Sequence, residues 1–273
     1  MMQLIQTMLS YPFIVRALIV GTLVSLCAAL LGVSLVLKRF SMIGDGLSHV
    51  GFAALAIASV MGAAPLAVAI PVVVVAAFFL LRMNENSKLN GDAATAILCS
   101  SALAAGVMIT SVVKGMNTDL SSYMFGSILA MSNSDVILSL VLSAVVLVLF
   151  IVFYNRIFAV TFDENFAKAT GIKTGLYNML IAFLTAITIV LGMRMMGTLL
   201  ISSLIIFPAL TAMRVFKRFF SVILCAAILS VSCFIIGMVL SFAFSLPTGA
   251  AVVAANLSMF LIFSLIGKVK EGR

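Results

Sequence analysis

A carboxylate and an imidazole lie four residues apart near the amino end of one apolar segment. They are Asp45 and His49, the single histidine of the chain. On a helix, a spacing of four places both side chains on the same face. Oxygen and nitrogen ligands together suit zinc, manganese or ferrous iron, and the lack of a cysteine nearby in the sequence argues against a thiolate-rich site. The pair therefore predicts a site for a divalent metal ion.

Two ligands from one chain cannot complete the shell of four or more that such an ion prefers. A twofold homodimer with this helix at its axis would bring two copies of each side chain to one ion, so a homodimer is expected. Gly44, Gly46 and Gly51 remove side-chain bulk beside the pair and would let a neighbouring helix approach closely. In the alternative interpretation, Asp45 only caps the helix and His49 only donates a hydrogen bond to a backbone carbonyl.

A second candidate segment connects two apolar runs at residues 155–175. Its central part, residues 162–172, carries Asp163 and Glu164 where a helix favours acidic side chains, and Gly171 where a helix would end. This pattern predicts a short amphipathic helix on the cytoplasmic surface of the membrane. An ordinary connector between two membrane spans is the alternative interpretation.

Hydroxyl groups and a proline lie within a later apolar segment, residues 197–212. Ser202 and Ser203 are followed by Pro208, which removes a backbone donor and commonly kinks a helix. A kinked helix with hydroxyl groups would suit the wall of a transport pathway. Serine in membrane helices more often serves plain helix packing, and packing is the preferred interpretation here.

The elements that must position these residues are transmembrane helices. Hydrophobic residues make up 64% of the 273 residues and charged residues only 9%, against about 25% charged in soluble proteins. The continuous apolar runs have the length of about 20 residues that a helix needs to cross the bilayer, whereas a membrane barrel needs short alternating segments. The cysteines lie inside these runs and are interpreted as small hydrophobic residues, not as a disulfide framework: Cys27, Cys99, Cys225 and Cys233.

The sequence therefore predicts an all-α, polytopic transmembrane helical bundle that forms a single domain over residues 1–273. About nine spans are expected, at residues 13–37, 44–62, 65–81, 92–114, 135–154, 176–193, 197–213, 219–244 and 249–267. Basic residues set the orientation, because they are enriched on the cytoplasmic side. With an outside amino terminus and a cytoplasmic carboxy terminus, only Arg16, Lys114 and Arg194 fall outside, and the cytoplasmic set is Lys38, Arg39, Arg82, Lys88, Arg156, Lys168, Lys173, Arg214, Lys217, Arg218, Lys268, Lys270 and Arg273.

Four segments, in this order, resemble the permease family of bacterial zinc, manganese and iron ABC importers: residues 44–51, 121–132, 162–172 and 197–212. The likeness extends over nearly the whole chain. It implies that Asp45 and His49 are the metal pair within the membrane and that residues 155–175 couple the permease to an ATPase. The residues that match the coupling helix of the family are Asp163, Glu164, Phe166, Ala167, Ala169, Thr170 and Gly171.

The resemblance also implies the function and the partners. The chain would move a divalent metal ion into the cell, with zinc and manganese favoured over iron, through the bacterial inner (plasma) membrane. The sequence contains no phosphate-binding loop, so ATP hydrolysis would reside in a separate cytoplasmic subunit, and the chain itself would be no enzyme. The expected partners are a second copy of the chain, that ATP-binding subunit, an extracellular or periplasmic metal-binding protein and membrane lipid, with no nucleic acid and no permanently bound cofactor.

Two other functions remain open at this point. In an ion-coupled secondary transporter, Asp45 and His49 would relay protons without any ATPase. An ABC permease for a metal chelate, such as cobalamin or a siderophore, would use a similar fold with a wide cavity and would need no metal-ligating pair.

Overall fold

A computed structural model describes residues 6–8, 10–86, 91–112, 126 and 132–271, and no β-strand occurs among them. The resembling segment at 121–132 therefore lies outside the described residues except for its positions 126 and 132. The helices are α2 (Pro12–Leu37), α3 (Ile43–Met61), α4 (Pro65–Asn86), α5 (Gly91–Val112), α7 (Asn133–Val152), α8 (Tyr154–Phe162), α9 (Glu164–Ala169), α10 (Thr174–Met196), α11 (Thr198–Val215), α12 (Phe219–Phe244) and α13 (Thr248–Glu271).

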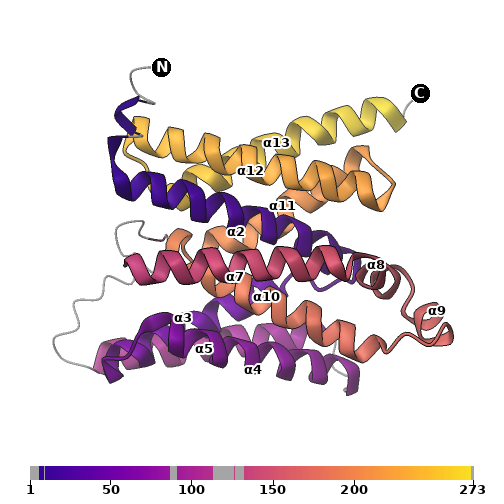
Figure 1. Ribbon diagram of the computed structural model, residues 1–273, viewed down its shortest axis with the longest axis horizontal. Helices are drawn as coiled ribbons and strands as arrows, with labels where there is room; N and C mark the ends of the chain where they lie inside the picture. Colours follow the sequence, from indigo (N-terminus) through magenta and orange to yellow (C-terminus); the bar gives the residue numbers. More distant parts are fainter. Residues whose placement is uncertain (1–5, 9, 87–90, 113–125, 127–131, 272–273) are drawn as a thin grey trace.

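The long helices run side by side as a bundle (Figure 1). In the described part of the chain, eight of them are long and apolar enough to cross a membrane, and they coincide with eight of the nine predicted spans. The remaining predicted span, 197–213, is the shorter helix α11, whose apolar part covers Leu200–Val215. The all-α polytopic bundle expected from the sequence is thereby confirmed.

Helices α2, α10 and α11 form the centre of the bundle, with α12 and α13 packed on one side and α3, α4 and α5 on the other (Figure 1). In a bilayer, helices gain little from the hydrophobic effect against one another, so close packing of small residues becomes important. Gly32 of α2 illustrates this, because a Cβ atom at this position would lie 2.1 Å from the backbone oxygen of Ile205 in α11. The backbones of these two central helices touch only because residue 32 has no side chain.

Replacing Gly32 with alanine is expected to lower the free energy of unfolding by about 1–3 kcal/mol, because the added methyl group must push two helix backbones apart. Gly175→Ala is the matched control, since a Cβ atom there meets nothing within 4 Å outside its own turn of helix. The measurement is reversible unfolding of both variants in detergent micelles. Equal stability of the two variants would contradict the close contact between α2 and α11.

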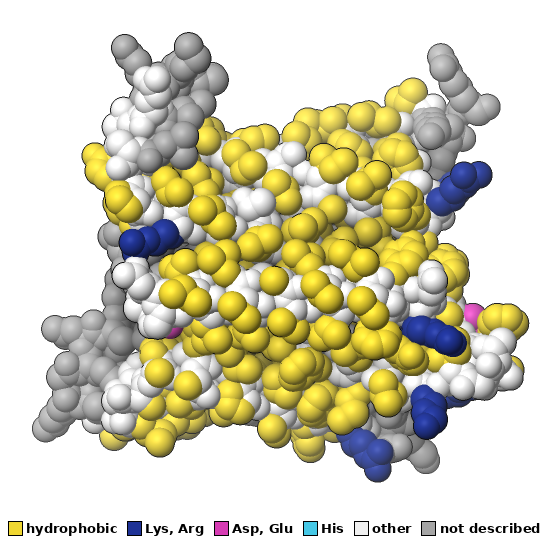
Figure 2. All heavy atoms as spheres, viewed as in Figure 1, with side chains coloured by type: hydrophobic (Ala, Val, Ile, Leu, Met, Phe, Trp, Pro, Cys, Tyr) yellow, Lys and Arg dark blue, Asp and Glu magenta, His cyan; other side chains and the backbone are white. Residues whose placement is uncertain are grey.

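Charged side chains lie at the ends of the bundle. Figure 2 shows a central band of hydrophobic side chains, with Lys and Arg gathered mainly at the end that carries α8 and α9. The start of α2 and the end of α13 lie at opposite ends of the bundle, as an odd number of crossings requires (Figure 1). We call the end that carries α8 and α9 the basic end. Its cytoplasmic position stays a prediction that follows from this charge asymmetry.

The second candidate segment, residues 155–175, is largely helical. The short amphipathic helix expected within it is α9, and its first turn is capped by Asp163, whose Oδ1 accepts a hydrogen bond of 2.9 Å from the Phe166 backbone N–H. Gly171 has a φ of +83°, a backbone conformation that ends a helix readily only when the residue is glycine. The sequence did not predict α8, which precedes α9.

Candidate metal site

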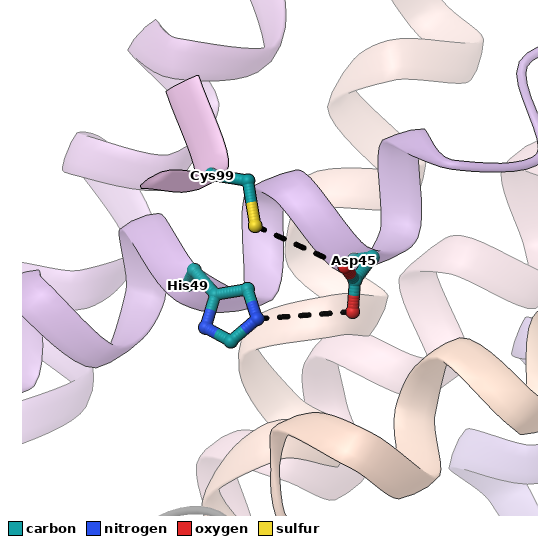
Figure 3. Close-up of side chains that lie close together, drawn as sticks. All are labelled: Asp45, His49 and Cys99. Atoms are coloured by element: carbon teal, nitrogen blue, oxygen red, sulfur yellow. Dashed lines mark hydrogen bonds and ion pairs between the residues drawn. The ribbon is translucent and has the colours of Figure 1, made fainter. Parts of the chain in front are cut away.

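The predicted pair lies at the start of α3, with Asp45 in the first turn and His49 one turn later. His49 Nε2 is 3.8 Å from Asp45 Oδ1, so the two side chains share one face of the helix as the spacing predicted (Figure 3). The His49 side chain is 11% exposed and that of Asp45 is 32% exposed. A carboxylate in the first turn is also stabilised by the positive end of the helix dipole.

A third ligand atom comes from α5, which lies beside α3. The Sγ atom of Cys99 is 3.8 Å from Asp45 Oδ2, and the thiol donates to this carboxylate (Figure 3). One ligand atom from each of Asp45, His49 and Cys99 lies within 4.8 Å of the other two. No cysteine lies near the pair along the sequence, but the structure brings one thiol beside Asp45 from a neighbouring helix. The four cysteines are free, as expected, and form no disulfide framework.

Gly46 explains why α5 comes so close. A Cβ atom at Gly46 would lie 2.7 Å from Cγ2 of Thr95, so α5 packs against α3 where the side chain is missing. Thr95 precedes Cys99 by four residues, and the two therefore lie on the same face of α5. The glycine beside the pair thus admits a neighbouring helix, as the sequence predicted, and that helix carries the thiol.

Helix α11 also contacts the start of α3. A Cβ atom at Gly44 would lie 3.8 Å from Cα and 3.9 Å from Oγ of Ser202. This contact agrees with the preferred interpretation of Ser202 as a packing residue. Its hydroxyl is buried and has no hydrogen-bond partner within the described chain.

Glu164 ties α9 to two of the long helices. Its carboxylate lies 3.7 Å from Lys38 Nζ at the end of α2, 3.0 Å from Lys168 Nζ, and accepts a hydrogen bond of 3.3 Å from Asn178 in α10. Partial burial by itself would raise the pKa of the Glu164 carboxyl. The hydrogen bonds from Lys168 and Asn178 and the charges of Lys38 and Lys168 outweigh burial and hold its pKa below the ordinary value.

The other residues that match the coupling helix differ in exposure. Ala167 is fully buried, whereas Phe166 is 64% exposed. The Thr170 hydroxyl donates to the Ala167 carbonyl oxygen at 3.0 Å. Of all the residues that match the coupling helix, Glu164 contacts the segment that precedes the Asp45–His49 pair, because its partner Lys38 is followed directly by the turn into α3. The full set of residues that match the coupling helix is Asp163, Glu164, Phe166, Ala167, Ala169, Thr170 and Gly171.

A model of the ABC 3 transport family matches residues 10–267. The chain belongs to the ABC 3 transport family. The resemblance predicted from the sequence is thereby confirmed, as is its placement as a multi-pass protein of the bacterial plasma membrane.

Among ABC 3 relatives, the manganese import system permease protein ScaB of Streptococcus gordonii is 29% identical over 95% of this chain and 93% of its own length. The high-affinity zinc uptake system membrane protein ZnuB of Haemophilus influenzae is 29% identical, over 92% of this chain and 97% of its own. A solved structure, PsaBC from Streptococcus pneumoniae in complex with Fab, superposes with a TM-score of 0.85 at 29% identity and covers 96% of this chain and 94% of the matched one.

Proposed function

We propose that this chain is the permease subunit of an ATP-driven importer of a divalent transition-metal ion, with Asp45 and His49 binding the ion in transit. The observation that carries the proposal is the carboxylate and imidazole at 3.8 Å on one face of α3. The ion is the substrate and not a resident cofactor. ATP hydrolysis is assigned to a partner subunit, so the chain itself is no enzyme.

The spacing of the ligand atoms supports an ion of this class. Around a zinc ion bound at about 2.0–2.3 Å, two ligands of a tetrahedral shell stand roughly 3.3–3.8 Å apart. The separation of Asp45 Oδ1 and His49 Nε2 is 3.8 Å, so small rotations of the two side chains suffice to bind one ion. The relatives named for manganese and for zinc favour the same class of substrate.

The partners follow from the surface at the basic end. The cytoplasmic ATP-binding subunit is proposed to bind at α9, within the coupling segment 155–175. Phe166 offers an exposed aromatic ring there. The contact of Glu164 with Lys38 connects this helix to the turn that leads into α3. A homodimer and an external metal-binding protein complete the proposed importer.

The two rival functions have less support. A chelate as large as a siderophore needs a wide cavity, whereas the ligand atoms here converge within 4.8 Å, as suits a bare ion. A secondary transporter needs no coupling helix for an ATPase, and membership of an ABC family argues against it.

Reconstitution in lipid vesicles tests the proposal. Vesicles that contain this chain, its ATP-binding subunit and the metal-binding protein are loaded with ATP, and the entry of labelled zinc and manganese is measured. Uptake is expected to require ATP and to stop when the ATP-binding subunit carries an inactivating substitution. Equal uptake without that subunit would favour a secondary transporter, and full uptake by an Asp45→Asn, His49→Ala double variant would favour a chelate permease.

A further inference from the structure

The metal cluster consists of Asp45, His49 and Cys99. His49 lies near Asp45 because the two are four residues apart on one helix, whereas Cys99 is distant in the sequence. It belongs to α5, and the contact between α3 and α5 at Gly46 and Thr95 places it there. Its sulfur lies 3.8 Å from Asp45 Oδ2, on a different oxygen from the one that faces His49. Cys99 and Asp45 are both partly exposed at the surface of a single chain.

We propose that Cys99 is a third metal ligand, and that the resulting oxygen, nitrogen and sulfur set makes the pathway select Zn²⁺ over Mn²⁺. This inference rests on the proposed function, because it assigns the identity of the ion at the same site. The three ligand atoms lie within 4.8 Å of one another. That spread exceeds the separation in a tetrahedral zinc site by roughly 1 Å, a distance that side-chain rotations can close.

Charge neutrality supports the thiolate as a ligand. The ion carries two positive charges, and an uncompensated charge within a membrane is costly. One carboxylate and one thiolate cancel both charges within a single chain, while His49 binds as a neutral imidazole. The thiol proton leaves to water as the Zn–S bond forms, so the exchange is balanced.

The ligand types decide between the two leading metals. Thiolate sulfur is a soft ligand that binds zinc well, whereas manganese prefers carboxylate, carbonyl and water oxygen. Three protein ligands leave one position of a tetrahedral zinc shell open, and a transported ion needs that position to enter and leave the site.

Spectroscopy with Co²⁺ as the probe tests whether the sulfur binds metal. The native permease with its ATP-binding subunit, in lipid nanodiscs, is expected to show a near-ultraviolet thiolate-to-cobalt charge-transfer band that zinc displaces. Cys99→Ser is expected to lose the band, and Cys225→Ser, a matched change at another partly exposed cysteine, is expected to keep it. A native complex without the band, or a Cys99→Ser variant that retains it, overturns the proposal.

Transport selectivity gives the second measurement. Cys99→Ser is expected to lower the ratio of zinc to manganese uptake by about tenfold or more, the scale on which even weaker perturbations of a metal site act. An unchanged ratio in Cys99→Ser, with uptake abolished by His49→Ala, removes Cys99 from the site but leaves the proposed function standing. Alkylation of Cys99 in the native chain, slowed by zinc and not by manganese, gives a readout that depends on no variant.

Discussion

Uptake of labelled zinc and manganese is expected to fall by more than about tenfold when His49 is replaced by alanine, because a metal site loses at least that much affinity when a ligand is removed. The imidazole is the single nitrogen ligand of the described cluster, at 3.8 Å from Asp45 Oδ1. Asp45→Asn should have a similar effect, since it removes the negative charge that balances the ion. Uptake is measured in cells that express the importer with its partners, at equal amounts of permease in the membrane.

Ser48→Ala is the matched control for this prediction. Ser48 is buried in the same turn of α3, and its hydroxyl donates to the backbone oxygen of Asp45 at 2.8 Å. Its loss should leave uptake near the native rate. Native rates for both metals in His49→Ala would instead make His49 a simple hydrogen-bonding residue, and the search for the pathway would move to α5 and α11.

The positions of the long helices could be predicted from the sequence because each is a continuous apolar run of the length that a bilayer requires. The predicted span 44–62, for example, is the helix Ile43–Met61. The register of Asp45 and His49 followed from the same argument, since helix geometry alone sets a shared face for residues four apart.

Helix α8 could not be found in this way. Its nine residues start with Tyr154, Asn155 and Arg156, which interrupt the apolar run of α7 and resemble the start of a loop. The helix forms because Ile157 and Val160 are buried against the bundle, while Phe158 and Phe162 stay exposed. Tertiary packing therefore decides the structure of a segment whose local pattern is too short to be informative.

The place of Cys99 in the site is a consequence of helix packing. Its sulfur contacts a residue 54 positions earlier in the chain. Which helices become neighbours in a bilayer depends on matching small and larger side chains, such as Gly46 against Thr95, and hydropathy carries no such information. A third ligand within one chain also weakens the argument that a second copy must complete the metal shell. The proposed homodimer then rests on the resemblance to the permeases of metal ABC importers.

Replacing Phe166 with alanine is expected to uncouple transport from ATP hydrolysis. The ring is 64% exposed on a helix that Glu164 fixes to α2 and α10, which is the arrangement of a rigid aromatic anchor for a partner protein. Truncation of such an anchor typically costs ~2 kcal/mol or more, roughly a 30-fold loss of affinity. The measurement compares metal uptake, ATP hydrolysis and binding of the ATP-binding subunit in vesicles that contain the native or the variant permease.

Phe220→Ala provides the control, because this ring is 65% exposed on α12, outside the proposed coupling segment. Both variants should insert into the membrane normally, since neither ring is buried in the bundle. Only Phe166→Ala should weaken subunit binding and stop uptake while the ATP-binding subunit continues to hydrolyse ATP. If Phe166→Ala keeps the uptake of the native permease, α9 is an ordinary connector. The ATP-binding subunit must then contact another part of the basic end, such as the pocket at the turn between α11 and α12 that Arg214, Lys217 and Arg218 line.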